Sequence, residues 1–367
     1  MLFLLIALQF HDFPFTSRVI EPLAKKPIFY TDEMNVRLFG IHKFHIFDSE
    51  KYFHIFETLT SLGIFSPNEF SIPPINETFA DELLQLVHTK QYLDGCLQNA
   101  TCIASVAEFP PLQFLPVSVL QSKIIFPMKV HVLSTIAATE AALHYNYSIS
   151  LGGGLHHAHA NMGSGWCFFD DIGISIKYWK CIKKAFQKVL IIDTDAHQGN
   201  GYQHDKINQV LACGENDSMN DIFVVDLFNR AIYPHDSIAK RAINVKVELR
   251  SGTEDKYYIS SLRKALNIVV KKFQPDIIFF VSGSDILSYV FSEEKSLTSV
   301  RRGDPLGAMN ISPKGLLQRD YIIFDYAINK FKAPIVMVLA GGYSRSSAHV
   351  IANSIMHLKH FLFESHH

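Results

Sequence analysis

The sequence predicts an α/β protein, built as a single domain on a central, mostly parallel β-sheet with helices on both faces. Short apolar runs of strand length alternate with longer segments in which apolar residues recur every three or four positions, which is the pattern of strands and amphipathic helices. The 367 residues are 48% hydrophobic and contain no linker, internal repeat or low-complexity segment. One large domain with a substantial core accounts for this length.

The first third of the chain supplies one strand, two helical segments and a loop. Residues 1–26 form an ill-defined leader, after which PIFY at 27–30 predicts a short strand. Apolar residues recur at three-residue spacing from 48 to 63, which predicts an amphipathic helix closed by Gly63. A second helical segment extends from about 81 to 98. The proline-rich run FPPLQFLP at 109–116 cannot continue a helix and predicts a surface loop.

The rest of the chain alternates between helix and strand. Strands are predicted at 148–151, from 189, and at 222–225, 276–281 and 335–339. Helices are predicted at 129–145, 172–186, 254–272 and 313–329, and a last helix follows the strand at 335–339 and ends at about 363. Ser312 before Pro313 is typical of a helix start, as N-cap and first helical residue. Strands that alternate with helices form a parallel sheet covered on both faces, so we expect one domain from 27 to 363.

Composition argues against two kinds of partner. The formal net charge is −1 and the pI is about 7.0, so the chain lacks the basic surface that direct nucleic-acid binding requires. No apolar run approaches the roughly eighteen residues of a membrane-spanning helix. We therefore expect no direct contact with nucleic acid and no membrane span.

The cysteines favour a reducing compartment. The chain has five of them: Cys96, Cys102, Cys167, Cys181 and Cys213. They are odd in number, widely spread and without a C-x-x-C pair, which argues against a disulfide framework and against a cysteine zinc site. The apolar start MLFLLIAL and five N-x-S/T sequons point instead to secretion: Asn76, Asn99, Asn146, Asn216 and Asn310. No basic residue precedes the apolar run and no cleavage site is clear, so we expect the nucleus or the cytoplasm.

The strand predicted from Val189 is followed within a few residues by polar side chains, in the sequence VLIIDTDAHQGNG. Asp193, Asp195 and His197 alternate, so their side chains project to one side if the chain stays extended. Two carboxylates and an imidazole at the carboxyl end of a parallel strand would form a divalent-metal site. On its own, such a sequence is more often an acidic strand end with a helix cap.

Three other predicted strands end in similar chemistry. GGGLHH places His156 and His157 side by side, where two imidazoles can serve as base and acid. VSGSDIL supplies Asp285, and VLAGGY supplies Tyr343. Each alone has an ordinary explanation as a structural histidine pair, a helix cap or a packed tyrosine. Because the carboxyl ends of parallel strands share one edge of the sheet, we expect the four clusters to meet.

Together these motifs resemble those of the zinc-dependent histone deacetylases, and among them the class IV type. The resemblance extends from about residue 27 to 361 and rests on GGGLHH, GSGWCFFDDI, DTDAHQGNG, NRAIYP, GTED, SGSDIL with DPLG, and AGGY. It implies the arginase/deacetylase-like fold, with a zinc ion held by Asp195, His197 and Asp285.

The same resemblance assigns catalytic roles. His156 and His157 correspond to the family's tandem histidines, backed by Asp193 and Asn200 respectively. Tyr343 corresponds to its oxyanion-stabilising tyrosine. Zinc in such a site lowers the pKa of bound water to about 7 and polarises an amide carbonyl. His157, oriented by a neutral amide, would be the less basic imidazole and accept a proton, whereas His156 would stay cationic.

The resemblance also implies a tunnel and a second cation. Gly165 and Trp166 fall where the family lines its acyl-lysine tunnel. Class IV enzymes are associated with removing long fatty-acyl chains from lysine. Four small residues lie near the histidine pair: Ala158, Ala160, Gly163 and Gly165. Their size either leaves room for such a chain or reflects ordinary packing. The backbone of five residues is similar to a structural potassium site: Asp193, Asp195, His197, Asp226 and Leu227.

The sequence therefore predicts a zinc-dependent hydrolase that removes acyl groups, acetyl or long-chain, from lysine side chains of proteins such as histone tails. One alternative is an enzyme of the same fold that hydrolyses a small acylated amine, although an arginase-like dinuclear site would need more carboxylates. A non-catalytic binding scaffold is the other, which the complete set of ligands and Tyr343 disfavours. Substrate identity, complex partners and oligomeric state stay open.

The chain departs from the class IV pattern at three places. The connection at 288–302, between Asp285 and DPLG, is longer than in relatives and leaves from a metal ligand, so it should alter the mouth of the site. The passage at 211–220 is extended in the same way. Ile46 replaces a proline of the family's FHxFD segment, with no consequence that follows from the sequence.

Overall fold

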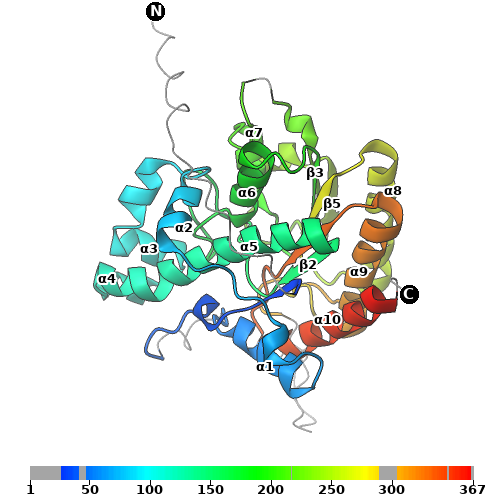
Figure 1. Cartoon of the computed structure of the whole chain (residues 1–367), viewed down its shortest axis with the longest axis horizontal. Coiled ribbons are helices and arrows are strands. Elements are labelled where there is room, and N and C mark those ends of the chain that lie inside the picture. Colours follow the sequence, from blue (N-terminus) through cyan, green and yellow to red (C-terminus); the bar gives the residue numbers. More distant parts are fainter. Residues whose placement is uncertain (1–25, 41–46, 216, 289–303, 345–346, 365–367) are drawn as a thin grey trace, which may run out of the picture.

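The computed structural model describes residues 26–40, 47–215, 217–288, 304–344 and 347–364 (Figure 1). The predictions for residues 1–25, for Ile46 and for residues 289–302 of the long connection lie outside these ranges.

A parallel β-sheet of seven strands runs through the centre of the described chain (Figure 1). Its spatial order is β1-β2-β7-β6-β3-β4-β5, and every neighbouring pair is parallel, which confirms the predicted fold class. The strands are β1 (Ile28–Phe29), β2 (Tyr147–Ser150), β3 (Val189–Asp193), β4 (Ile222–Asn229), β5 (Val245–Leu249), β6 (Ile277–Val281) and β7 (Ile335–Val338).

Helices cover both faces of the sheet because alternate residues of each buried strand point in opposite directions. In β3, Val189 and Ile191 face the core under α5 and α6, whereas Leu190 and Ile192 face the core under α1, α8, α9 and α10. The helices are α1 (Lys51–Ser61), α2 (Glu77–Leu84), α3 (Ala100–Val106), α4 (Val117–Leu120), α5 (Phe126–Tyr145), α6 (Asp171–Ile176), α7 (Asn200–Ile207), α8 (Asp255–Lys272), α9 (Pro313–Asp325) and α10 (Ser347–Glu364). No helix among these residues is long and apolar enough to cross a membrane.

The four motif-bearing strands are consecutive neighbours in the middle of the sheet. GGGLHH follows β2, AGGY follows β7, SGSD follows β6, and DTDAH begins at the end of β3. In register, Ser150 pairs with Val338, Val338 with Val281, and Val281 with Asp193, so the four strands end level with one another. This arrangement delivers all four clusters to one place.

The predicted helix at 81–98 is wrong as a continuous element. Helix α2 ends at Leu84, and a separate turn of helix follows at Tyr92–Cys96. Between them, the backbone N–H of Thr89 donates to Ala160 O at 2.9 Å, and buried His88 accepts the backbone N–H of Asp170 at 3.0 Å. These contacts with the segment after β2 interrupt the helix in spite of its local periodicity.

The expectation of unpaired cysteines is also wrong. Cys96 is disulfide-bonded to Cys102, and Cys181 to Cys213, with Cα atoms 5.2 and 4.9 Å apart. Both Cα distances fall in the ordinary range for disulfides. Cys167 is the one cysteine that remains a thiol, and it is buried. The odd number therefore reflects two pairs and one core residue.

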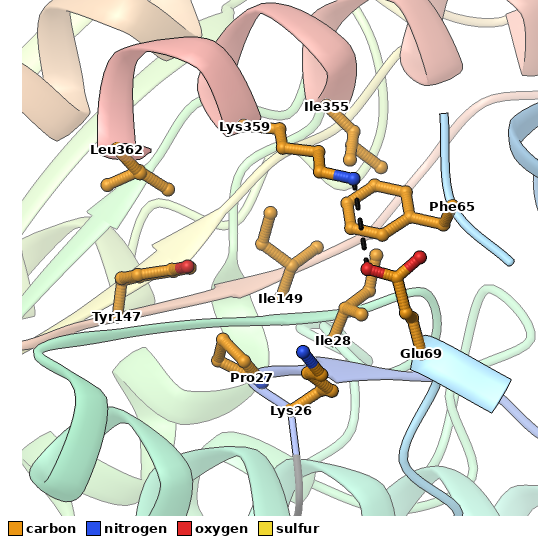
Figure 2. Close-up of a pocket in the computed structure, with 10 residues that line it drawn as sticks. All are labelled: Lys26, Pro27, Ile28, Phe65, Glu69, Tyr147, Ile149, Ile355, Lys359 and Leu362. Atoms are coloured by element: carbon orange, nitrogen blue, oxygen red, sulfur yellow. Dashed lines mark ion pairs between the residues drawn. The ribbon is translucent and has the colours of Figure 1, made fainter. Parts of the chain in front are cut away.

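A groove lies at the amino-terminal ends of β1 and β2, the end of the sheet opposite the motifs (Figure 2). Figure 2 shows Lys359 of α10 over the ring of Phe65, with its ammonium 3.9 Å from a carboxylate oxygen of Glu69. Apolar side chains from both strands, including Ile28 and Ile149, form the floor. None of the residues that line this groove belongs to the predicted catalytic site.

Candidate active site

The three predicted metal ligands converge at the carboxyl ends of β3 and β6. Asp195 and His197 follow β3, Asp285 follows β6, and all three are buried. Their ligand atoms lie within 4.8 Å of one another. Nδ1 of His197 lies 2.8 Å from Oδ2 of Asp285 and 3.1 Å from Oδ1 of Asp195. The chain does not stay extended here, because β3 ends at Asp193 and residues 195–197 form a bend, yet Asp195 and His197 still lie beside Asp285.

The electrostatics of this cluster favour a bound cation. Burial by itself lowers the pKa of His197, but hydrogen bonds to Asp195 and Asp285 raise it to about 10. Burial and then the charge of Asp195 raise the pKa of Asp285 to about 7. Two carboxylate oxygens and one imidazole nitrogen are donors that zinc uses in catalytic sites with three protein ligands and one open position. The residues present therefore fit a zinc ion.

Backbone groups from neighbouring strands fix the orientation of the two carboxylates. Gly341 N–H donates to Oδ2 of Asp195 at 2.7 Å, and Ala196 N–H donates to Oδ1 of Asp285 at 2.9 Å. A Cβ atom at position 341 would lie 2.5 Å from Oδ2 of Asp195, so only glycine allows this approach. The AGGY motif therefore shapes the metal site as well as carrying a tyrosine.

The tandem histidines differ in their partners and consequently in charge. Nδ1 of His156 lies 2.9 Å from Oδ2 of Asp193, and Nδ1 of His157 lies 2.8 Å from Oδ1 of Asn200. Burial opposes protonation of both rings, but Asp193 outweighs it and raises the pKa of His156 to about 9. Burial and the positive neighbours His156 and His197 lower the pKa of His157 well below its usual value.

This pair therefore combines one cationic imidazole with one neutral imidazole, and the ring centroids are 4.1 Å apart. Because the amide oxygen of Asn200 can only accept, Nδ1 of His157 carries the proton in this contact. Nε2 of His157 is then an acceptor, as a general base requires.

Asp171 is a positioning residue that sequence reasoning missed. Its carboxylate is fully buried and accepts the backbone N–H groups of Gly154 and Leu155 at 2.9 and 2.7 Å. These are the two residues before His156, so Asp171 holds the turn that presents the histidine pair. The signal lay in the FFDDI motif, where two adjacent aspartates open a helix.

Tyr343 lies beside the metal ligands, with its ring centroid 6.0 Å from that of His197. Its backbone N–H donates to Oδ2 of Asp304 at 2.9 Å, which ties it to the DPLG motif. Burial, followed by the charges of Asp195 and Asp285, raises the pKa of Tyr343 well above its usual value. The hydroxyl stays protonated and can therefore donate a hydrogen bond.

Lys51 is a second positioning residue, and unlike Asp171 it has no sequence signal. It projects from α1, is fully buried, and its ammonium donates to Ala340 O and, at 3.2 Å, to Gly341 O. Burial lowers the pKa of Lys51 to about 8. The two carbonyls belong to the segment that leads to Tyr343. Lys51, from the amino-terminal part of the chain, therefore holds this segment in place.

The residues predicted to line a tunnel lie against His157. Gly165 has φ +55°, and a Cβ atom there would lie 2.9 Å from the His157 ring. Trp166 is buried and stacks on Phe47 with centroids 5.5 Å apart. Tyr233, from NRAIYP, was missed as a site residue. Its ring lies 5.0 Å from His157, with 40% of the residue exposed.

A small cavity with a volume of about 30 Å³ adjoins the histidine pair. Both histidines, Trp166 and Tyr343 are among the residues that line it. The apolar side chains of Met128, Leu155 and Leu339 also line it. A buried water needs on the order of 10–15 Å³ of such space, so the cavity has room for about two waters.

Two of the five residues of the predicted potassium site lie on neighbouring strands, Asp193 as the last residue of β3 and Asp226 within β4. Asp193 pairs with Asp226 in the register of the two strands. Oδ2 of Asp226 accepts Gly199 N–H at 3.2 Å, whereas its buried Oδ1 has no hydrogen-bond partner among the described residues. A buried carboxylate oxygen without a donor is chemically suited to a cation.

The chain is similar to known proteins in sequence and in fold. Residues 45–358 match the family described as "Histone deacetylase domain". The chain is 36% identical over 337 residues to histone deacetylase 2 of Arabidopsis thaliana, covering 92% of this chain and 79% of that protein. It is 26% identical to an acetoin utilization protein of Staphylococcus aureus, over 88% of this chain and 78% of the relative. A crystal structure of an HDAC homolog from Aquifex aeolicus superposes with a TM-score of 0.65 and 22% identity, covering 90% and 82% of the two chains.

Proposed function

This chain belongs to the histone deacetylase family, and on that premise we propose that it is a zinc-dependent hydrolase that removes acyl groups from lysine side chains of proteins. The observation that carries the proposal is the convergence of Asp195, His197 and Asp285 beside a cationic and a neutral histidine and a protonated tyrosine. We also propose the class IV type, on the motifs quoted above.

The chain's own residues divide the work of amide hydrolysis among them. When bound, zinc supplies Lewis acidity and lowers the pKa of water. Nε2 of His157 accepts the proton of the attacking water, because its low pKa keeps it neutral. Cationic His156 stabilises developing negative charge, and the Tyr343 hydroxyl donates a hydrogen bond to the oxyanion. Proton return to the leaving lysine amine completes the reaction.

A second candidate function is hydrolysis of a small acylated amine. The observation that favours it is the similarity to a bacterial acetoin utilization protein. This similarity, at 26% identity, is weaker than the 36% identity to the plant histone deacetylase. A panel of acyl-lysine peptides, free acyl-lysine and acylated diamines, assayed on purified protein together with metal analysis, separates the two. We expect cleavage of the peptides by protein that contains zinc. Activity confined to free acyl-lysine and the acylated diamines would contradict the proposal.

We propose further that the acyl group is a long chain. The cavity of about 30 Å³ is too small for a myristoyl tail, so Met128 and the other apolar side chains that line it must move to admit one. Each buried methylene contributes about 0.8 kcal/mol, and a tenfold preference needs about 1.4 kcal/mol. We expect kcat/KM for a myristoyl-lysine peptide to exceed that for the matched acetyl-lysine peptide at least tenfold.

The control for this prediction is a pair of variants at Met128, which is buried against the cavity. Met128→Trp should lower the myristoyl rate and spare the acetyl rate, whereas the volume-conserving Met128→Leu should change neither much. Equal or reversed rates on the matched peptides of the unaltered enzyme would leave an ordinary deacetylase.

Asn200→Asp tests the role of the neutral partner of His157. A carboxylate 2.8 Å from Nδ1 favours the imidazolium and raises the pKa of His157. The general base is then protonated up to a higher pH, so the acidic limb of kcat/KM should move upward by about one pH unit or more. Asn220→Asp, which changes an exposed asparagine in the same way, is the control. An unmoved acidic limb would mean that another group accepts the proton.

We propose that potassium occupies the second cation site, on the strength of the unpartnered Oδ1 of Asp226. A ligand that binds only the folded state stabilises it by RT ln(1 + [L]/Kd), so the melting temperature rises with ligand concentration. We expect a higher midpoint in potassium chloride than in tetramethylammonium chloride of equal ionic strength, and a smaller difference for Asp226→Ala. Identical midpoints for the unaltered protein in the two salts would argue against a bound potassium ion.

A further inference from the structure

Four of the five cysteines form two disulfide bonds, and these lie in different parts of the fold. Cys96–Cys102 joins the turn after α2 to α3, whereas Cys181–Cys213 joins residues that are 32 positions apart, after α6 and after α7. Neither pair lines the cavity of the candidate active site. Disulfides persist in oxidising compartments and are rare where thiols are kept reduced. Their position outside the site points to a structural role.

Two of the sequons carry a second, independent indication of the same compartment. Asn76 and Asn99 are both exposed, and each caps a helix through its side-chain oxygen. Oδ1 of Asn76 accepts Phe79 N–H at 3.0 Å, and Oδ1 of Asn99 accepts Cys102 N–H at 3.1 Å. In both residues Nδ2, the atom that bears an N-linked glycan, has no hydrogen-bond partner among the described residues.

The other sequons are less open. Asn310 donates its Nδ2 to Glu254 at 3.3 Å, and Asn146 is exposed but precedes buried Ser148, whose hydroxyl donates to Ala138 O. Asn216 lies outside the described residues. By contrast, Thr78 and Thr101, the third residues of the two open sequons, are exposed. Among the described sequons, Asn76 and Asn99 are therefore the two in which the asparagine and the third residue are both exposed.

We propose that this protein matures in the secretory compartments of a eukaryotic cell, where it acquires both disulfides and N-linked glycans at Asn76 and Asn99. Disulfides persist in that compartment and are rare where thiols are kept reduced, and the exposed sequons offer acceptors for the glycans that are added there. The inference replaces the nuclear or cytoplasmic location expected from the cysteine pattern. It is independent of the proposed deacylase activity. Where both hold, the substrates are acyl-lysine proteins of that compartment or of the cell exterior, and not histones.

The chemistry of both modifications balances with reactants of that compartment. In each cysteine pair, one thiolate attacks the disulfide of a dithiol–disulfide oxidoreductase, and the second thiolate displaces the enzyme from the mixed disulfide. Two electrons thereby pass to the oxidoreductase, which leaves as a dithiol. At each asparagine, Nδ2 forms a bond to C1 of a lipid-linked oligosaccharide and loses a proton, while the lipid pyrophosphate leaves.

The test uses the full chain expressed with its own amino terminus in cultured eukaryotic cells. Cells are lysed in N-ethylmaleimide, so that thiols are blocked before they can oxidise, and the denatured protein is mapped by mass spectrometry without reduction. We expect Cys167 to be the only alkylated cysteine and peptides linked as Cys96–Cys102 and Cys181–Cys213. Removal of glycans with an amidase should leave aspartate at positions 76 and 99.

Matched variants separate the glycan from the helix cap. Thr78→Ala and Thr101→Ala each destroy one sequon but keep the capping asparagine, so each should lose one glycan without loss of folding. Thr78→Ser and Thr101→Ser keep the sequon and should keep the glycan. Alkylation of all five cysteines, or unmodified asparagine at both positions, would overturn the proposal, whatever the activity of the protein on acyl-lysine.

Discussion

Asp285→Ala is expected to remove zinc and activity together. Asp285 contributes one of three ligand atoms that lie within 4.8 Å of one another, and two ligands hold the ion poorly. Loss of a partner that merely orients a ligand typically costs 10–100-fold in metal affinity, so loss of a ligand itself should cost at least about 100-fold. The same result is expected for His197→Ala. Zinc content by elemental analysis and kcat/KM on an acyl-lysine peptide are measured on one preparation.

The control for ligand removal is Asp94→Ala, which deletes an exposed carboxylate whose partner is Lys90 in the same helical turn. This variant should keep zinc and full activity. Thermal denaturation of each variant distinguishes loss of the ion from loss of the fold. Stoichiometric zinc in an active Asp285→Ala protein would remove Asp285 from the metal site.

Tyr343→Phe is expected to keep zinc and fold but to lower kcat by about 10²-fold or more. The substitution deletes one hydroxyl and leaves the ring, which packs edge-on against Phe47 with centroids 5.9 Å apart. Removal of one oxyanion donor in comparable sites costs about 3 kcal/mol, because the bond matters in the transition state. Steady-state kinetics with zinc analysis measures the effect.

Tyr257→Phe is the matched control, because Tyr257 is an exposed tyrosine of α8 outside the site. Its kcat should be unchanged. If Tyr343→Phe raised KM and left kcat intact, the hydroxyl would bind the ground state of the substrate and not the oxyanion.

The catalytic constellation could be predicted because its residues follow local rules. A parallel sheet brings the carboxyl ends of its strands to one edge, and the predicted residues follow those ends. That rule needs only the order of strands and motifs, and the structure brings Asp195, His197 and Asp285 together, although the chain bends at 195–197 and does not alternate as an extended strand would. The pKa difference between His156 and His157 followed in the same way, from one charged and one neutral partner.

Residues that act through long-range contacts could not be found in this way. Lys51 reaches a carbonyl oxygen 289 positions further along the chain, and nothing in its neighbourhood marks it. Cys181 and Cys213 pair because α6 and α7 lie close together, which spacing does not reveal. The helix expected at 81–98 failed for the same reason, since a hydrogen bond from Thr89 to Ala160 overrides local periodicity.

Two further elements were missed in the sequence. Strand β5 shows the alternation of an edge strand, with Val245 and Leu249 buried and Lys246 and Glu248 exposed. β5 has few apolar residues, so it is harder to recognise in the sequence than the central strands, which are continuous apolar runs. Helix α7 begins at Asn200, directly after the turn that carries Asp195 and His197, and the glycines Gly199 and Gly201 do not mark a helix start at that point in the sequence.

The central position of β2, β7, β6 and β3 has a consequence for how the enzyme loses activity. In native-state amide hydrogen exchange, interior strands of a sheet open only with the whole molecule, whereas edges fray at far lower cost. The edges here are β1 and β5, and neither carries a catalytic group. Molecules whose edge strands have frayed therefore keep the arrangement of Asp195, His197 and Asp285. Loss of activity in heat or denaturant should then coincide with cooperative global unfolding and should not precede it.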